Sequence, residues 1–224
     1  MGRYPEGMIK GAIFDCDGTL LDTMPLWREA AGKYLTTLGI EVDKDLGAQF
    51  FEMTLPESAH LVHQRFGLDV TVSEVVNGIK DAVYTGYLEE VQLKPGARGF
   101  LEALAEAGVP MTVVSSGSEG LIRPAFRRLG IEEMFTQYFA SSETGMHKRE
   151  PTMFLQAAGA MGSVPEDAWV FEDAVYAVRV ANAAGFHTVG IADDASRGES
   201  DALSAEAEAY WEEFPAAIPD FMLQ

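Results

Sequence analysis

The chain has little of what would place it outside the cell or in a membrane. It contains a single cysteine, Cys16, which excludes an intramolecular disulfide and fits a reducing compartment. No apolar run reaches the length of a membrane-spanning helix, and the N-terminal residues lack the pattern of a signal peptide. We therefore expect a cytoplasmic protein with no membrane partner, and we favour a monomer.

Basic residues are also scarce. The chain has 16 Lys and Arg against 35 Asp and Glu, which gives a formal net charge of −19. A surface this acidic repels nucleic acids and anionic membranes, so neither is an expected partner. It also repels a phosphorylated ligand at long range, and a site for such a ligand must therefore contain its own local positive charge.

The chain does have enough hydrophobic residues to form a substantial core. Its 224 residues are 47% hydrophobic, enough for one domain with a smaller insert, and we find no internal repeat. Short apolar runs alternate with amphipathic helical segments, which predicts an α/β fold with a doubly wound parallel sheet. The expected strands are near residues 11–15, 111–114, 138–140, 169–171 and 187–191, with a further short strand at Tyr210 and Trp211.

Residues 24–91 interrupt this alternation, because no strand-like run occurs in them. Helical patterns are expected to follow Pro25 and to occupy residues near 43–53, 56–66 and 73–89. We therefore expect an all-helical inserted domain at 24–91 and an α/β core domain made of residues 1–23 and 92–224. Trp27 and Tyr34, spaced on one helix face, are expected to belong to the core of the insert.

The segment Gly11–Asp22 organises the rest of the chain. It begins as an apolar run too short for a helix, which predicts a buried central strand, and it ends in carboxylates, a glycine and a hydroxyl. Burying Asp15 and Asp17 at the end of such a strand is costly unless a positive group meets them, and a divalent cation is the simplest candidate. Ligands of open α/β sheets bind at this edge of the sheet.

Three further segments strengthen this interpretation. Ser115-Ser116-Gly117 ends the second predicted strand, Lys148–Phe154 opens a later helix, and Glu172-Asp173 ends the fourth strand. Together with Phe14–Thr23, which reads Phe-Asp-Cys-Asp-Gly-Thr-Leu-Leu-Asp-Thr, they occur in the order of the four motifs of a known family. The chain resembles the haloacid dehalogenase superfamily, in the branch of β-phosphoglucomutase-like and phosphoglycolate-phosphatase-like proteins.

The resemblance implies a Mg²⁺-dependent phosphatase of a small phosphorylated metabolite, such as a sugar phosphate. Asp15 would be the nucleophile that forms an aspartyl-phosphate, and also a metal ligand. Asp17 would act as general acid and then as general base, with its backbone carbonyl on the metal. The helical insert would be the cap that closes over the site. Cys16 points the other way along the strand and is expected to be a core residue.

The second motif would bind the phosphoryl group. The hydroxyl of Ser115, with the N–H groups of Ser116 and Gly117, can bind a phosphoryl oxygen. The alignment can also slip by one residue, so that Ser116 supplies the hydroxyl. The simplest non-functional interpretation is a turn that starts a helix.

The third and fourth motifs would supply charge. Lys148 would place a fixed positive charge beside the phosphate, but Arg149 stands where the family usually has proline. The alternatives are that Arg149 or His147 makes this contact, or that Lys148 is an ordinary solvated lysine. Both Glu172 and Asp173 belong to the expected metal site: Asp173 is the better candidate for direct coordination, and Glu172 would act through water. The expected cofactor is Mg²⁺.

Two other functions compete with the phosphatase. A phosphomutase on the same scaffold would use a cap histidine and a cap arginine, but Trp27 and Leu55 occupy the aligned positions, which favours hydrolysis of a monophosphate. A non-catalytic binding protein is the other alternative. The joint presence of Asp15, Lys148 and Asp173 with Asp17 argues against it.

Overall fold

The computed structural model describes residues 9–42, 53, 55–194 and 196–223. The chain divides into two compact units, one formed by Met1–Asp22 with Gln92–Gln224 and one by Thr23–Val91. We call them the α/β unit and the helical unit. None of the helices in the described ranges combines the length and the apolar composition needed to cross a bilayer.

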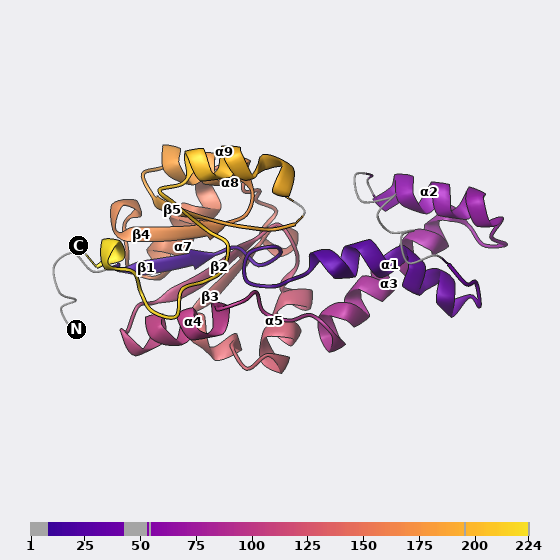
Figure 1. The fold of residues 1–224 in the computed structure, drawn as a ribbon, viewed down its shortest axis with the longest axis horizontal. Coiled ribbons are helices and arrows are strands. Elements are labelled where there is room, and N and C mark those ends of the chain that lie inside the picture. The colour runs from indigo at the N-terminus through magenta and orange to yellow at the C-terminus, as the bar shows by residue number, and fades with distance from the viewer. Residues whose placement is uncertain (1–8, 43–52, 54, 195, 224) are drawn as a thin grey trace. The chain divides into compact units, whose positions relative to one another are not determined.

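The described residues of the α/β unit form one six-stranded sheet in the order β3-β2-β1-β4-β5-β6, and all five pairings are parallel (Figure 1). This confirms the predicted doubly wound α/β fold, including the last short strand. The strands are Gly11–Phe14 (β1), Met111–Ser115 (β2), Gln137–Ala140 (β3), Ala168–Glu172 (β4), His187–Ile191 (β5) and Ala209–Trp211 (β6).

Helices follow the strands as expected, with two that were not foreseen. The helices of this unit are Ala97–Glu106 (α4), Glu119–Arg128 (α5), Ser141–Thr144 (α6), Thr152–Ala160 (α7), Val175–Ala183 (α8) and Ser200–Glu206 (α9), with short 3-10 helices at Glu132–Met134, Pro165–Asp167, Arg197–Glu199 and Asp220–Met222. Helices α6 and α9 were not predicted, because segments of four and seven residues are too short to show the hydrophobic periodicity of a helix.

The two faces of the sheet are both covered, which explains the continuous apolar run of β1. Ile13 belongs to an apolar cluster with residues of α7 and α8. The next residue, Phe14, points to the other face, where its ring stacks on Phe171 at 4.4 Å and meets Phe100 of α4. Because successive side chains of a strand alternate between faces, a central strand covered on both sides is apolar throughout. Cys16 is fully buried, as expected.

The helical unit contains the helices Met24–Thr37 (α1), Leu55–Phe66 (α2) and Val72–Glu89 (α3) in its described residues. Two glycines let α1 and α3 approach closely. A Cβ atom on Gly86 would lie 2.6 Å from the Leu26 side chain, and one on Gly78 would lie 2.0 Å from the ring of Tyr34. The helix expected near 43–53 falls outside the described residues, apart from Met53.

The prediction that Trp27 belongs to the core of the insert was wrong. Its side chain is 41% exposed, whereas Leu26, Ala30 and Tyr34 are buried. Leu26, which packs against Gly86 of α3, is buried in place of Trp27, whereas Tyr34, the other residue predicted for this core, is buried as expected.

Candidate active site

The central strands bring acidic residues together at the carboxyl edge of the sheet. Phe14 of β1 is paired with Phe171 of β4, so Asp15 and Glu172 leave the sheet side by side. Asp173 follows directly. One carboxylate oxygen from each of Asp15, Glu172 and Asp173 lies within 4.8 Å of the others. We call these three residues the acid cluster.

Lys148 is the cation that the structure brings to the acid cluster. Its side chain is 2% exposed, and its ammonium group donates hydrogen bonds to Asp15 Oδ1 and, at 2.8 Å, to Glu172 Oε2. His147 and Arg149 are exposed, and the Arg149 guanidinium lies 5.0 Å from the ring centre of Tyr176. The fixed charge beside Asp15 therefore comes from Lys148, which is not solvated.

The acid cluster carries more negative charge than Lys148 can balance. Burial, followed by the charges of Asp15 and Glu172, raises the pKa of the Asp173 carboxyl. Burial and the charge of Asp15 also raise the pKa of Glu172, against the opposing charge of Lys148. Burial alone would lower the pKa of Lys148, but the charges of Asp15 and Glu172 outweigh it and raise that pKa.

The donor set of the acid cluster fits a magnesium ion. Its ligands would be hard carboxylate oxygens from Asp15, Glu172 and Asp173, which are the donors that Mg²⁺ prefers in proteins. A divalent cation would also offset the negative charge that, together with burial as the larger cause, raises the pKa values of Glu172 and Asp173. Asp17 would add a backbone carbonyl to this set.

Gly18 and Thr19 fix the position of Asp173. Gly18 has a φ of +83°, and a Cβ atom there would lie 2.6 Å from Asp173 Oδ2, so only glycine fits. Thr19 is fully buried, and its hydroxyl donates to Asp173 Oδ1 at 3.4 Å. No role for Thr19 was predicted, although a hydroxyl directly after the motif carboxylates was visible in the sequence.

Asp17 is not one of the three residues of the acid cluster. A Cβ atom on Gly117 would lie 3.5 Å from Asp17 Oδ2, which places the partly buried Asp17 carboxylate against the loop that follows β2. The same Cβ atom would lie 3.2 Å from Ser115 Oγ, so the Asp17 carboxylate and the Ser115 hydroxyl both border Gly117.

The loop after β2 distinguishes the two candidate hydroxyls. Ser115 is 1% exposed, and its Oγ accepts a hydrogen bond from Gly117 N at 2.9 Å. Ser116 is exposed. A hydroxyl that accepts one bond keeps its own hydrogen for donation, so Ser115 Oγ is suited to donate to a phosphoryl oxygen.

A further acid near the cluster was missed by the sequence analysis. Asp193 is 6% exposed, and a Cβ atom on Gly18 would lie 3.4 Å from its carboxyl carbon. Lys94 Nζ lies 2.5 Å from Asp193 Oδ2 and donates to Ala192 O at 3.0 Å. Asp193 follows β5 by two residues, so its place at the same edge of the sheet was the available signal.

Comparison with known proteins agrees with this geometry. The chain is 30% identical over 188 residues to "Fructose-1-phosphate phosphatase YqaB" of Escherichia coli (strain K12), covering 81% of this chain and 95% of that protein. It is 27% identical over 183 residues to "Hexitol phosphatase A" of the same organism, covering 81% and 82%. Both relatives are named as phosphatases, which supports the interpretation of this chain as a phosphomonoester hydrolase.

The fold also matches solved structures. A Thermotoga maritima protein provisionally named β-phosphoglucomutase superposes with a TM-score of 0.80 at 23% identity, over 90% of this chain and 94% of that one. At that identity the likeness concerns the fold alone. The model of the haloacid dehalogenase-like hydrolase family matches residues 9–185, which confirms the resemblance predicted from the four motifs. The chain belongs to the haloacid dehalogenase-like hydrolases.

Proposed function

We propose that the protein is a Mg²⁺-dependent phosphatase of a small phosphorylated metabolite, with Asp15 as the nucleophile. The observation that carries this proposal is the buried acid cluster around Lys148, which has three carboxylates within 4.8 Å and one cation. The proposal assigns residues 1–23 and 92–224 to a catalytic core and residues 24–91 to a cap. The phosphatase names of the relatives support the substrate class.

The reaction would proceed in two balanced steps. In the first, an oxygen of Asp15 attacks phosphorus, the bond between phosphorus and the ester oxygen breaks, and Asp17 gives its proton to the departing oxygen. In the second, water attacks the phosphorus of the aspartyl-phosphate, the bond between phosphorus and the Asp15 oxygen breaks, and the attacking water gives a proton to Asp17. The products are an alcohol and inorganic phosphate, and both carboxyl groups return to their starting states.

Lys148 and the loop after β2 would hold the phosphoryl group. Lys148 is fixed by Asp15 and Glu172, so its charge needs no rearrangement when charge develops in the transition state. The hydroxyl of Ser115 and the backbone N–H of Ser116 would donate to the phosphoryl oxygens. Together these groups would orient the phosphorus toward Asp15.

The carboxylates of Asp15, Glu172 and Asp173 and the backbone carbonyl of Asp17 would hold the Mg²⁺ ion. When bound, the ion supplies positive charge that reduces the repulsion between the attacking carboxylate and the phosphate dianion. The charge balance supports the need for it: among the described residues, the acid cluster brings together three carboxylates, and its ion pairs are both with Lys148.

The proposed substrate is a monophosphate. Trp27 and Leu55 stand where the β-phosphoglucomutase branch has its cap histidine and arginine, and both line an apolar cavity of about 290 Å³ within the helical unit. Neither side chain can carry a proton or pair with a second phosphate. The alternative is a phosphomutase, which would return the phosphoryl group to a sugar.

The experiment is a screen of phosphorylated metabolites with Mg²⁺, beginning with sugar phosphates, in which released phosphate is measured. A second assay supplies glucose 1-phosphate with a trace of glucose 1,6-bisphosphate. We expect phosphate release in the screen and little glucose 6-phosphate in the second assay. Rapid formation of glucose 6-phosphate with little free phosphate would establish the mutase instead.

A further inference from the structure

The short helix α6 is hydrogen-bonded to the loop that follows β2. Ser141 Oγ donates to Ser115 O at 3.4 Å. The backbone N of Ser142 donates to Gly117 O at 3.3 Å, and Ser142 Oγ lies 3.1 Å from the same oxygen. The residues of α6 thus engage the backbone carbonyls of a loop that starts 26 positions earlier in the chain.

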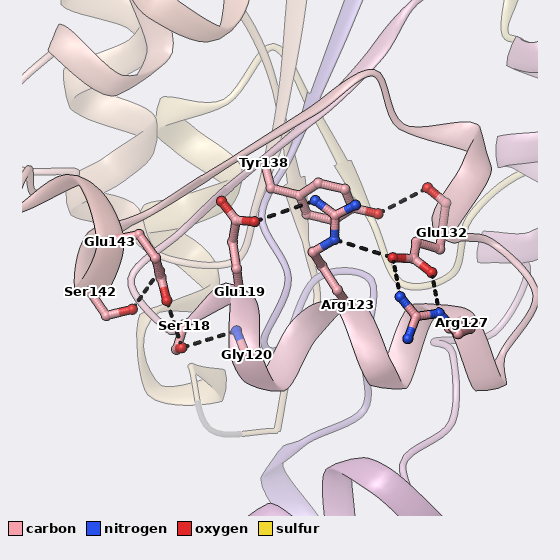
Figure 2. A network of polar contacts seen from close by, with 9 residues as sticks. All are labelled: Ser118, Glu119, Gly120, Arg123, Arg127, Glu132, Tyr138, Ser142 and Glu143. Carbon is pink, nitrogen blue, oxygen red and sulfur yellow. Dashed lines mark hydrogen bonds and ion pairs between the residues drawn. The ribbon is translucent and has the colours of Figure 1, made fainter.

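Glu143 completes this connection (Figure 2). Its Oε1 accepts a hydrogen bond from Ser118 Oγ at 2.8 Å, and its Oε2 lies 2.5 Å from Ser142 Oγ. Ser118 Oγ in turn accepts from Gly120 N at 3.1 Å and so caps α5. The single hydrogen of Ser142 Oγ serves Glu143 or Gly117 O at any moment, while the backbone N of Ser142 holds Gly117 in either case.

The carbonyls held by α6 determine where the neighbouring N–H groups point. In a trans peptide the C=O of one residue and the N–H of the next point in opposite directions, and the described residues contain no cis peptide. Holding Ser115 O toward α6 therefore directs the N–H of Ser116 away from α6. Holding Gly117 O does the same for the N–H of Ser118. A loop with free rotation at these peptides would not keep its donors on one side.

We propose that Ser142 and Glu143 are positioning residues for phosphate binding. They hold the loop Ser115–Ser118 so that the N–H groups of Ser116 and Ser118 and the Ser115 hydroxyl converge on a phosphoryl group. This inference rests on the proposed function, because it takes that loop as the phosphate-binding loop. Lys148 follows the last residue of α6 by four positions. The segment that holds the loop after β2 therefore also carries Lys148, the other proposed phosphate contact.

The sign of the effect separates positioning from simple electrostatics. Glu143 is an exposed carboxylate, and if it acted only through its charge, its removal would reduce repulsion and tighten phosphate binding. Positioning predicts the opposite result. We expect Glu143→Ala to weaken binding of inorganic phosphate about tenfold, the scale for losing two hydrogen bonds. Glu143→Gln keeps one acceptor oxygen and is expected to weaken binding by about threefold.

The test is titration calorimetry of the full chain with inorganic phosphate in the presence of Mg²⁺. Glu106→Ala is the matched control, because it removes the same charge from an exposed residue of α4. We expect this control to bind phosphate and to melt like the wild type, and both Glu143 variants to stay folded with melting temperatures lowered by no more than a few degrees. We also expect Glu143→Ala to raise KM for the substrate by the same factor, with a smaller change in kcat.

Phosphate binding by Glu143→Ala that equals or exceeds that of the wild type would overturn the positioning role. A wild-type chain that does not bind phosphate would overturn it as well. A wild type that binds phosphate, loses affinity in Glu143→Ala and yet hydrolyses no phosphate ester would support the positioning role and refute the proposed phosphatase. The two failures are therefore distinguishable.

Discussion

Two buried glutamates of the α/β unit, Glu172 and Glu132, have pKa values shifted in opposite directions. Glu172 shares Lys148, the one basic residue that pairs with it in the described part of the chain, with Asp15, and burial raises the pKa of Glu172. Glu132 accepts hydrogen bonds from two arginines, with Arg127 Nε at 2.7 Å from Oε2 and Arg123 Nε at 3.2 Å from Oε1 (Figure 2). The hydrogen bond from Arg127, with that from Arg123, lowers the pKa of Glu132.

The network around Glu132 extends into the sheet. The Tyr138 hydroxyl of β3 donates to the backbone O of Glu132 at 3.0 Å, and the Arg123 guanidinium lies 4.8 Å from the centre of the Tyr138 ring. In this network the two arginines balance the charge of Glu132, and the contacts join α5 to β3. In the acid cluster the positive charge of Lys148 does not balance three carboxylates. Excess charge of one sign in a buried site indicates a function, whereas a balanced network indicates a structural role.

Asp15→Asn should give the largest effect. It removes the nucleophile and one negative charge but keeps the side-chain volume, so phosphate release is expected to fall to background. The melting temperature is expected to stay at or above that of the wild type, because the cluster loses part of its excess charge. Turnover and thermal unfolding are measured on the same preparation. A folded variant with near wild-type phosphate release would refute the assignment of Asp15.

Removal of Mg²⁺ should abolish activity reversibly. A chelator is expected to reduce phosphate release to background, and added Mg²⁺ to restore it. Independently of turnover, Mg²⁺ is expected to raise the melting temperature of the wild type but not of Asp173→Asn, because binding stabilises only a chain that holds the ion. Undiminished activity in excess chelator would contradict the metal proposal.

Lys148→Ala should reduce kcat on the order of 10²-fold or more, the scale for losing one preorganised electrostatic contact. Arg149→Ala is the matched control, since it removes the same charge from the neighbouring exposed residue. That variant is expected to stay within a few-fold of the wild type. Equal losses in the two variants would show that general attraction of the phosphate matters more than the buried contact.

Glu132→Gln should leave kcat unchanged and lower the melting temperature by a few degrees. The folded-state pKa of Glu132 is lowered, so its contribution to stability is present above its unfolded pKa of about 4.3 and is lost as the pH falls through the folded value. The melting-temperature difference from the wild type is therefore expected to be complete at neutral pH and to shrink in acid. A variant that loses activity but keeps its stability would erase the contrast with Glu172.

Local patterns in the sequence were sufficient for most of the fold. Strand β5, His187–Ile191, has the bounds that were predicted for it, because a short apolar run between turn residues has few alternative structures. The buried face of α1 was predicted correctly at Tyr34 and wrongly at Trp27, beside which Leu26 is the buried residue. The periodicity of α1 gives a broad apolar stripe, and only the contact with α3 decides which part of it is buried.

The sequence by itself determined that Asp15, Glu172 and Asp173 stand at the carboxyl ends of strands, because the order of strands and motifs is written in the chain. It left open which of His147, Lys148 and Arg149 would lie beside these carboxylates. Only the tertiary structure shows that Lys148 makes this contact and that Glu143 reaches the loop after β2. Both contacts join segments far apart in the chain, and the direction of a loop side chain depends on the packing of the elements that the loop connects.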